Sequence, residues 1–294
     1  MPRSLVLSIL VIVGATPTAA QLRPVTPAPA SATVATPLAI GESFLLTSAM
    51  LGEVRRINVY APPGYMDSPN VRLPVLYMPD GGIGEDFLHV AGLVQVLVGN
   101  GTMRPMLLVG IENTERRRDL TGPTTNEDDR KIAPRIGGSA AFRAFLRAEL
   151  KPLIATRYRT SGETAIVGES LAGLFVVETF LREPALFDTY LAFDPSLWWN
   201  NAELVEHVGD LMRSTSHLGV MTNKTLFLAS SSEASISGHT QRLATALERG
   251  AFPRVRWEYV PMPEERHATI YHPAALRAFR TVVKPLVPPR PSKH

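Results

Sequence analysis

The stretch TAIVGESLAG, residues 164–173, decides how this chain can fold. Its first four residues are a short apolar run of the kind that forms a buried strand. The residues from 171 to 181 are strongly apolar over a length that favours a helix. Only the tripeptide GES lies between the two runs. The sequence therefore predicts a tight strand-to-helix turn that carries a serine.

Ser170 lies in a variant of the Gly-x-Ser-x-Gly pattern of a nucleophile elbow, a strained turn that lifts a serine hydroxyl above the end of a sheet. Such a turn needs small residues because it brings backbone segments too close for large side chains. Gly168 occupies the first glycine position, Ala172 the second, and Gly173 follows. So short a motif also arises by chance. Its place between a strand and a helix is what predicts Ser170 as a nucleophile.

Apolar runs typical of strands alternate with segments of helical spacing along most of the chain. Strands are expected at 53–60, 73–78, 106–111, 164–167, 190–193, 225–229 and 255–260, and helices at 142–154, 171–181, 241–249 and 273–283. This alternation predicts a mostly parallel central sheet with helices on both faces. Together with the elbow, it indicates the α/β-hydrolase fold.

The N-terminus has the order of features found in a secretory signal peptide. Arg3 precedes an apolar run at residues 5–13, and small residues follow. A membrane anchor is the alternative, but the run is far shorter than the ~20 residues of a spanning helix. We expect a signal peptide at 1–20, a disordered Pro/Ala/Thr linker at 21–37, an α/β-hydrolase catalytic domain at 38–287 and a loose tail at 288–294. This organisation favours a periplasmic or secreted location.

The composition is that of an ordinary globular protein, with 45% hydrophobic residues, 19% charged residues and a net charge of +3. The absence of cysteine excludes disulfides, thiolate zinc sites and a lipoprotein anchor. Basic and acidic residues are interleaved between 116 and 135, which is typical of a solvated loop. The alternative is a rim that attracts anionic groups through Arg116 and Arg118. No basic stripe interleaved with aromatics occurs, so we expect no nucleic-acid partner.

A serine nucleophile needs a histidine base further along the chain. His267 follows the predicted strand at 255–260 and precedes the last predicted helix, which is where this fold supplies its histidine. His272, at a Pro-bounded helix start, and His239 are the alternatives. The position in the chain favours His267.

An acid is needed to accept the imidazole N–H, and two carboxylates end strands in the right interval. Asp194 follows the strand at 190–193, and Glu233 follows the strand at 225–229. Asp194 also begins an Asp-Pro-Ser turn signal, which is a local reason for its presence. We predict Glu233 as the acid, with Asp194 as the alternative.

Backbone N–H groups are expected to stabilise the oxyanion. Leu171, directly after the nucleophile, supplies one, and the loop after the strand at 73–78 supplies the other. Gly82 is the first choice in that loop and Gly81 the alternative. Trp198 and Trp199 follow a strand end at the same edge of the sheet. They are expected either to pack in the core or to form an aromatic wall for the substrate.

The chain resembles the putative-esterase family of α/β-hydrolases, in the branch that contains siderophore trilactone esterases. The similar segments are LPVLYMPDGG (73–82), VGIENTERRRDLT (109–121), the elbow, FDTYLAFDPSLWW (187–199), Glu233 and His267. They cover nearly the whole mature chain. Two departures are Ala172 at the elbow glycine and Asp194 where relatives often carry serine.

The resemblance implies a Ser170–Glu233–His267 triad, hydrolysis of a small-molecule carboxylic ester through an acyl-enzyme, and no metal or other cofactor. Siderophore-type trilactones are the first expected substrates. The alternatives are a carbohydrate-ester esterase of feruloyl or acetyl type, an acyltransferase that uses the same triad, and a non-catalytic binding protein on the same scaffold.

Overall fold

The computed structural model describes residues 36–217, 221–250, 252 and 254–286. The predicted signal peptide and C-terminal tail, and all but the last two residues of the predicted linker, lie outside these ranges. The chain divides into two units, Met1–Leu38 and Ala39–His294. All described helices and strands belong to the second unit.

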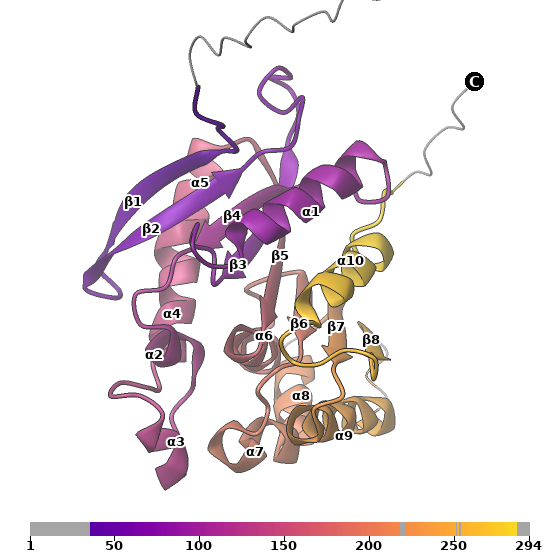
Figure 1. Cartoon of the computed structure of the whole chain (residues 1–294). Coiled ribbons are helices and arrows are strands. Elements are labelled where there is room, and N and C mark those ends of the chain that lie inside the picture. Colours follow the sequence, from indigo (N-terminus) through magenta and orange to yellow (C-terminus); the bar gives the residue numbers. More distant parts are fainter. Residues whose placement is uncertain (1–35, 218–220, 251, 253, 287–294) are drawn as a thin grey trace, which may run out of the picture. The chain divides into compact units, whose positions relative to one another are not determined.

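The described part of the second unit forms an eight-stranded sheet in the order β1-β2-β4-β3-β5-β6-β7-β8 (Figure 1). The strands are β1 (Glu42–Ser48), β2 (Glu53–Tyr60), β3 (Leu73–Pro79), β4 (Leu107–Ile111), β5 (Thr160–Glu169), β6 (Thr189–Phe193), β7 (Lys224–Ser230) and β8 (Val255–Pro261). The β1–β2 and β2–β4 pairs are antiparallel, and all other pairs are parallel. The mostly parallel sheet predicted from the sequence is thus confirmed.

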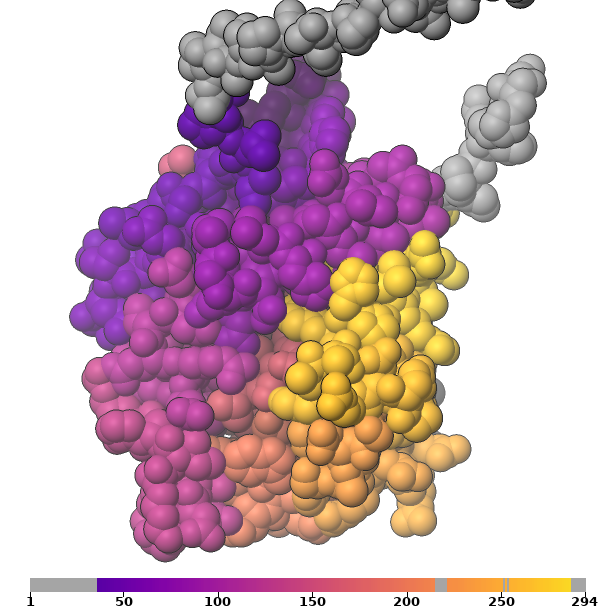
Figure 2. All heavy atoms as spheres, viewed as in Figure 1, coloured from indigo at the N-terminus to yellow at the C-terminus, as the bar shows by residue number. Residues whose placement is uncertain are grey.

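Helices cover both faces of the sheet, as expected for strands that are apolar throughout. One hydrophobic cluster lies between the sheet and α6 (Leu171–Arg182) and contains Phe142 and Phe175. A second cluster, with Phe87 and Phe279, lies between the other face and the helices α1 (Phe87–Gly99) and α10 (Tyr271–Thr281). These two helices pack against each other, and Figure 2 shows them adjoining on one face of the unit.

The remaining helices are α2 (Arg116–Leu120), α3 (Glu127–Lys131), α4 (Ser139–Phe145), the π-helical turn η1 (Leu146–Leu150), α5 (Lys151–Arg157), α7 (Trp199–Glu206), α8 (Val208–His217) and α9 (Ala234–Gly250). The predicted helix at 142–154 corresponds to the continuous run α4–η1–α5. No described helix combines the length and the hydrophobicity needed to cross a bilayer.

Six described elements escaped the sequence prediction, namely β1, α1, α2, α3, α7 and α8, of which β1 and α1 lie in or against the central sheet. The edge strand β1 has alternating exposure but follows a Pro-rich stretch and lies outside the parallel core. Helix α1 is apolar nearly all round, and its exposed side carries Leu88 and Val96. Because helix prediction depends on contrast between an apolar and a polar face, such a sequence gives no amphipathic signal.

Candidate active site

The carboxyl ends of β5, β6 and β7 lie level with one another. In the register of the sheet, Glu169 pairs with Phe193, and Phe193 pairs with Ala229. The residue after each strand therefore emerges at one edge, where open α/β sheets place their ligands. Ser170 and Asp194 consequently emerge on adjacent strands.

Ser170 occupies a strained turn between β5 and α6. Its φ and ψ of 59° and −120° lie in a region that side chains with a Cβ rarely enter. A Cβ on Gly168 would lie 2.6 Å from the backbone carbon of Ala172, and one on Gly173 would lie 2.9 Å from the Phe193 oxygen. Gly168 therefore provides the space that the Ala172 methyl occupies, which explains why alanine is compatible with this elbow.

The imidazole of His267 lies between Ser170 and a buried carboxylate. His267 Nε2 is 3.1 Å from Ser170 Oγ, and His267 Nδ1 is 2.7 Å from Asp194 Oδ2. Asp194 is fully buried and also accepts hydrogen bonds from Ser231, at 2.8 Å from the N–H and 2.7 Å from the hydroxyl. The hydrogen bond to Asp194 raises the pKa of His267, against the opposing effect of burial.

The prediction that Glu233 contacts this histidine is wrong. Glu233 is exposed and precedes α9, where its carbonyl accepts the N–H groups of Ile236 and Ser237. It follows β7, two strands away from the elbow, whereas Asp194 follows the neighbouring strand β6. The turn signal at Asp194 is real, since its φ is 44°. The same turn directs the Asp194 carboxylate to the imidazole, so Asp194 belongs both to the predicted turn and to the site.

The loop after β3 carries the two glycines considered for the oxyanion. The N–H of Gly81 donates to the Ile111 carbonyl at 3.0 Å and is already used within the sheet edge. The N–H of Gly82 donates at 2.7 Å to the side chain of Glu85, which is exposed and can move away. Leu171 is the first residue of α6, so its N–H has no acceptor within the helix.

Arg116 and Arg118 have different surroundings. Arg116 makes a two-pronged ion pair with Asp80, at 2.7 and 2.8 Å. Arg118 is bound by Glu53 and by the buried Asp119, which leaves its guanidinium occupied by structural partners. Of the two arginines predicted to reach an anionic substrate, only Arg116 lies near the elbow, where its charge acts on Glu169.

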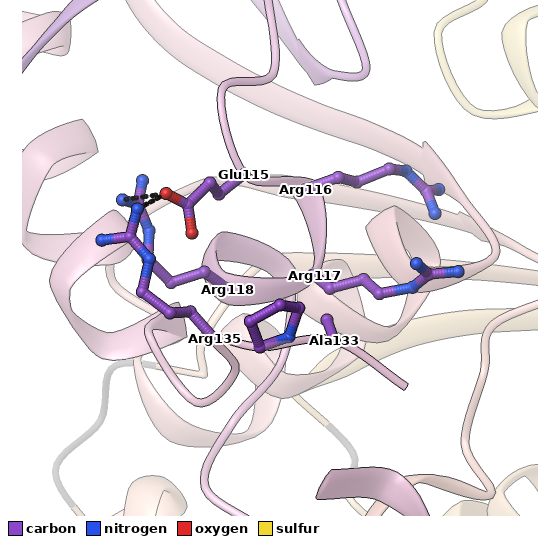
Figure 3. A pocket seen from close by; sticks show the side chains of 7 residues that line it. Glu115, Arg116, Arg117, Arg118, Ala133 and Arg135 are labelled. Atoms are coloured by element: carbon purple, nitrogen blue, oxygen red, sulfur yellow. Dashed lines mark ion pairs between the residues drawn. The ribbon is translucent and has the colours of Figure 1, made fainter. Parts of the chain in front are cut away.

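Both arginines line a pocket of about 620 Å³. Its wall is formed by Glu115, Arg116, Arg117, Arg118, Ala133, Pro134 and Arg135 (Figure 3). In this view Arg116 and Arg117 extend to the same side, while Glu115 pairs with Arg118 and Arg135. Arg116, Arg118 and Arg135 are paired with carboxylates. Arg117 is exposed and has no ion pair within the described part of the chain, so it is the cation that this pocket offers.

The two tryptophans lie beside the site without forming an open wall. Trp199 is buried, and its indole N–H donates to the Gly122 carbonyl at 2.9 Å. Trp198 is half-buried and packs against the same hydrophobic cluster. For Trp199, core packing is the better of the two sequence interpretations.

Three polar residues of the site were missed by the sequence analysis. Ser231 holds Asp194, the hydroxyl of Ser196 lies 3.4 Å from that of Ser170, and Glu169 Oε1 lies 3.3 Å from His267 Nδ1. Glu169 occupies a variable position of the elbow motif, and the two serines follow strands without any spacing signal. Their contacts depend on which residues are neighbours in the folded protein, and the sequence gives no signal for that.

A serine, a buried aspartate and a histidine in this chain order and geometry, on this fold, define the class of α/β-hydrolase serine hydrolases. Residues 48–244 match the family described as "Putative esterase", and the chain belongs to this family. It is a carboxylic ester hydrolase.

Relatives and solved structures agree with this assignment. The ferri-bacillibactin esterase BesA of Bacillus subtilis is 27% identical over 264 residues, which cover 79% of this chain and 86% of the relative. The siderophore triacetylfusarinine C esterase of Aspergillus fumigatus is 29% identical over 178 residues, or 56% of this chain and 59% of the relative. An IroE-like serine hydrolase from Shewanella oneidensis superposes with a TM-score of 0.72 at 28% identity, covering 83% of this chain and 80% of the other.

Proposed function

We propose that this chain hydrolyses esters by a double displacement in which Ser170 is the nucleophile, His267 the general base and Asp194 the acid of the triad. The observation that carries the proposal is the contact chain from Ser170 Oγ to His267 Nε2, at 3.1 Å, and from His267 Nδ1 to Asp194, at 2.7 Å. A serine hydroxyl is a weak nucleophile until a neighbouring base accepts its proton.

In the first half-reaction, Ser170 attacks the ester carbonyl as His267 takes the hydroxyl proton. Asp194 holds the imidazole by Nδ1 and stabilises the imidazolium. His267 then protonates the departing alcohol, which leaves the acyl group on Ser170. In the second half-reaction, water attacks the acyl group on Ser170 while His267 takes a proton from the water. His267 returns this proton to Ser170 Oγ as the carboxylic acid leaves.

We propose that the N–H groups of Leu171 and Gly82 donate hydrogen bonds to the oxyanion. Leu171 is available as the first residue of α6. Gly82 becomes available when the exposed side chain of Glu85 turns away from its N–H. The Gly81 N–H is excluded by its bond to Ile111.

The substrates we propose are anionic esters of the siderophore trilactone type. Several relatives are named as siderophore esterases. In addition, the pocket lined by Arg116 and Arg117 suits an anionic group, because guanidinium pairs well with planar oxyanions. We place the enzyme in the periplasm or outside the cell, on the basis of the signal peptide predicted at residues 1–20.

The experiment compares the wild type with Ser170→Ala on short- and long-chain nitrophenyl esters, feruloyl esters and ferric trilactone siderophores. We expect Ser170→Ala to abolish hydrolysis and labelling by a fluorophosphonate, with ferric trilactones as the preferred wild-type substrates. Ser214→Ala, which changes an exposed serine of α8, is the matched control. Full activity of Ser170→Ala would exclude the mechanism, and a preference for feruloyl esters would exclude the substrate class.

A further inference from the structure

The imidazole of His267 has two carboxylates at the same nitrogen. Asp194 Oδ2 lies 2.7 Å from Nδ1, and Glu169 Oε1 lies 3.3 Å from it. The proposed mechanism uses only the first of these. Glu169 is the last residue of β5 and directly precedes the nucleophile, so the elbow that positions Ser170 also positions this carboxylate.

The second carboxylate lies in a mostly enclosed and highly charged setting. Its side chain is 17% exposed. The charged groups that act on it are His267 and Arg116, which favour its ionised form, and Asp194 and Asp80, which oppose it. The charge of Glu169 also acts on Tyr271, the first residue of α10. Charges this close interact more strongly than they would in water, because the surrounding protein screens them less.

We propose that Glu169 is a positioning residue that stabilises the imidazolium of His267 as a second carboxylate at Nδ1. This inference rests on the proposed function. When His267 takes the proton of Ser170, the new positive charge lies between Asp194 and Glu169. Both carboxylates lower the energy of that state, although only Asp194 is at the distance of a strong hydrogen bond.

Glu169 also makes this stabilisation sensitive to pH. Burial raises the pKa of Glu169 to about 7, with His267 and Arg116 acting in the opposite direction. Glu169 therefore exchanges its proton near neutrality. Because Glu169 and His267 interact, their protons are lost in coupled steps that belong to the pair.

The test is a double-mutant cycle of Glu169→Gln and Asp194→Asn, with kcat/KM measured against pH on a nitrophenyl ester. Glu169→Gln alone is expected to lower the kcat/KM plateau by about fivefold. It is also expected to shift the acid limb to lower pH, because His267 loses a carboxylate that favours its protonated form. In the Asp194→Asn background, the same substitution is expected to cost more than it does alone, since Glu169 is then the remaining carboxylate at Nδ1.

A purely structural role for Glu169 predicts an unchanged acid limb and the same factor in both backgrounds, and either result would overturn the proposal. Glu169→Asp keeps the charge and is expected to return the acid limb of kcat/KM most of the way to its wild-type pH. This variant separates loss of charge from loss of packing. Glu264→Gln removes an exposed carboxylate from the loop that carries His267 and serves as the control.

A second measurement is independent of catalysis. The pKa of the His267 imidazole, followed by NMR in the substrate-free protein, is expected to fall in Glu169→Gln relative to the wild type. An unchanged value would refute the proposal even if activity dropped. Conversely, if the wild type neither hydrolyses esters through Ser170 nor reacts with a fluorophosphonate, the proposed function fails, whatever the pKa of His267 does.

Discussion

Asp194 binds His267 Nδ1 at 2.7 Å across 73 residues of chain, from the end of the strand next to that of the nucleophile. The carboxylate is fully buried and has two further hydrogen bonds from Ser231. A buried carboxylate with these partners holds the imidazole in one orientation. This contact distinguishes Asp194 from the other carboxylates at this edge of the sheet.

Asp194→Asn is therefore expected to lower kcat by about 10³–10⁴-fold, because an amide at this position favours the wrong tautomer of the imidazole. Glu233→Gln, which changes the exposed carboxylate favoured by the sequence, is expected to stay within a few fold of the wild type. Steady-state kinetics on one nitrophenyl ester measures both. The reverse ranking would return the role of the acid to Glu233.

Gly168→Ala is expected to destabilise the protein by at least about 2 kcal/mol and to impair catalysis, since the new methyl overlaps tightly packed atoms. Its Cβ would lie 2.6–2.7 Å from the backbone carbon, the oxygen and the methyl of Ala172. Adding Ala172→Gly is expected to rescue little, because the backbone overlap remains.

Urea denaturation measures these differences in the free energy of unfolding. Gly238→Ala is the control, because that glycine lies in α9 and has open space around its Cβ position. Alanine there is expected to be neutral or stabilising. Equal effects at Gly168 and Gly238 would contradict the steric account of the elbow.

Arg117→Gln is expected to raise KM for an anionic ester several-fold at low salt and to leave a neutral nitrophenyl ester unaffected. The side chain is exposed and extends to the same side of the pocket as Arg116 (Figure 3). Unlike Arg116, it can be replaced without breaking the pair with Asp80. The effect should fade as salt is added, since exposed charges are screened.

The matched control is Arg280→Gln, which removes an exposed arginine from α10. It lowers the net charge equally but lies outside the lining of the pocket. If both variants raised KM by the same factor, the effect would come from net charge and not from the pocket.

The contribution of Glu169 to the free energy of unfolding should fall as pH rises from about 4.5 to about 7. Its pKa is raised from 4.5 to about 7 in the folded state, so folding favours the protonated form. This contribution is fully present below pH 4.5 and is lost as pH rises to about 7. The total change is at most about 3 kcal/mol, less what solvent screening removes.

Glu169→Gln is expected to reduce the dependence of the free energy of unfolding on pH between about 4.5 and 7. Urea unfolding of the wild type and the variant between pH 4.5 and 8 measures it, because contributions from groups that do not interact with Glu169 cancel in the difference. The pKa of His267 is also raised, so its contribution to the free energy of unfolding likewise falls as pH rises. A difference that is constant over this range would contradict the raised pKa of Glu169.

The sequence by itself determined the features that depend on neighbours along the chain. The apolar runs predicted the parallel strands, and the strand-turn-helix setting of GES predicted the elbow that the φ of 59° at Ser170 realises. The position of His267 after the last strand indicated where the contact with Ser170 would come from. Strands and turns depend on side-chain periodicity and local backbone preference, which are readable in one dimension.

Three features are visible only in the tertiary structure. Asp194 and not Glu233 contacts His267. Arg118 is paired with Glu53 and Asp119, and Glu169 lies beside His267. Each of these outcomes depends on which strands are neighbours in the sheet and on which carboxylates are removed from water. A sequence pattern marks the end of a strand, but the order of strands in the sheet determines what lies opposite it. That order places β6 beside β5, and with it Asp194 within reach of the histidine.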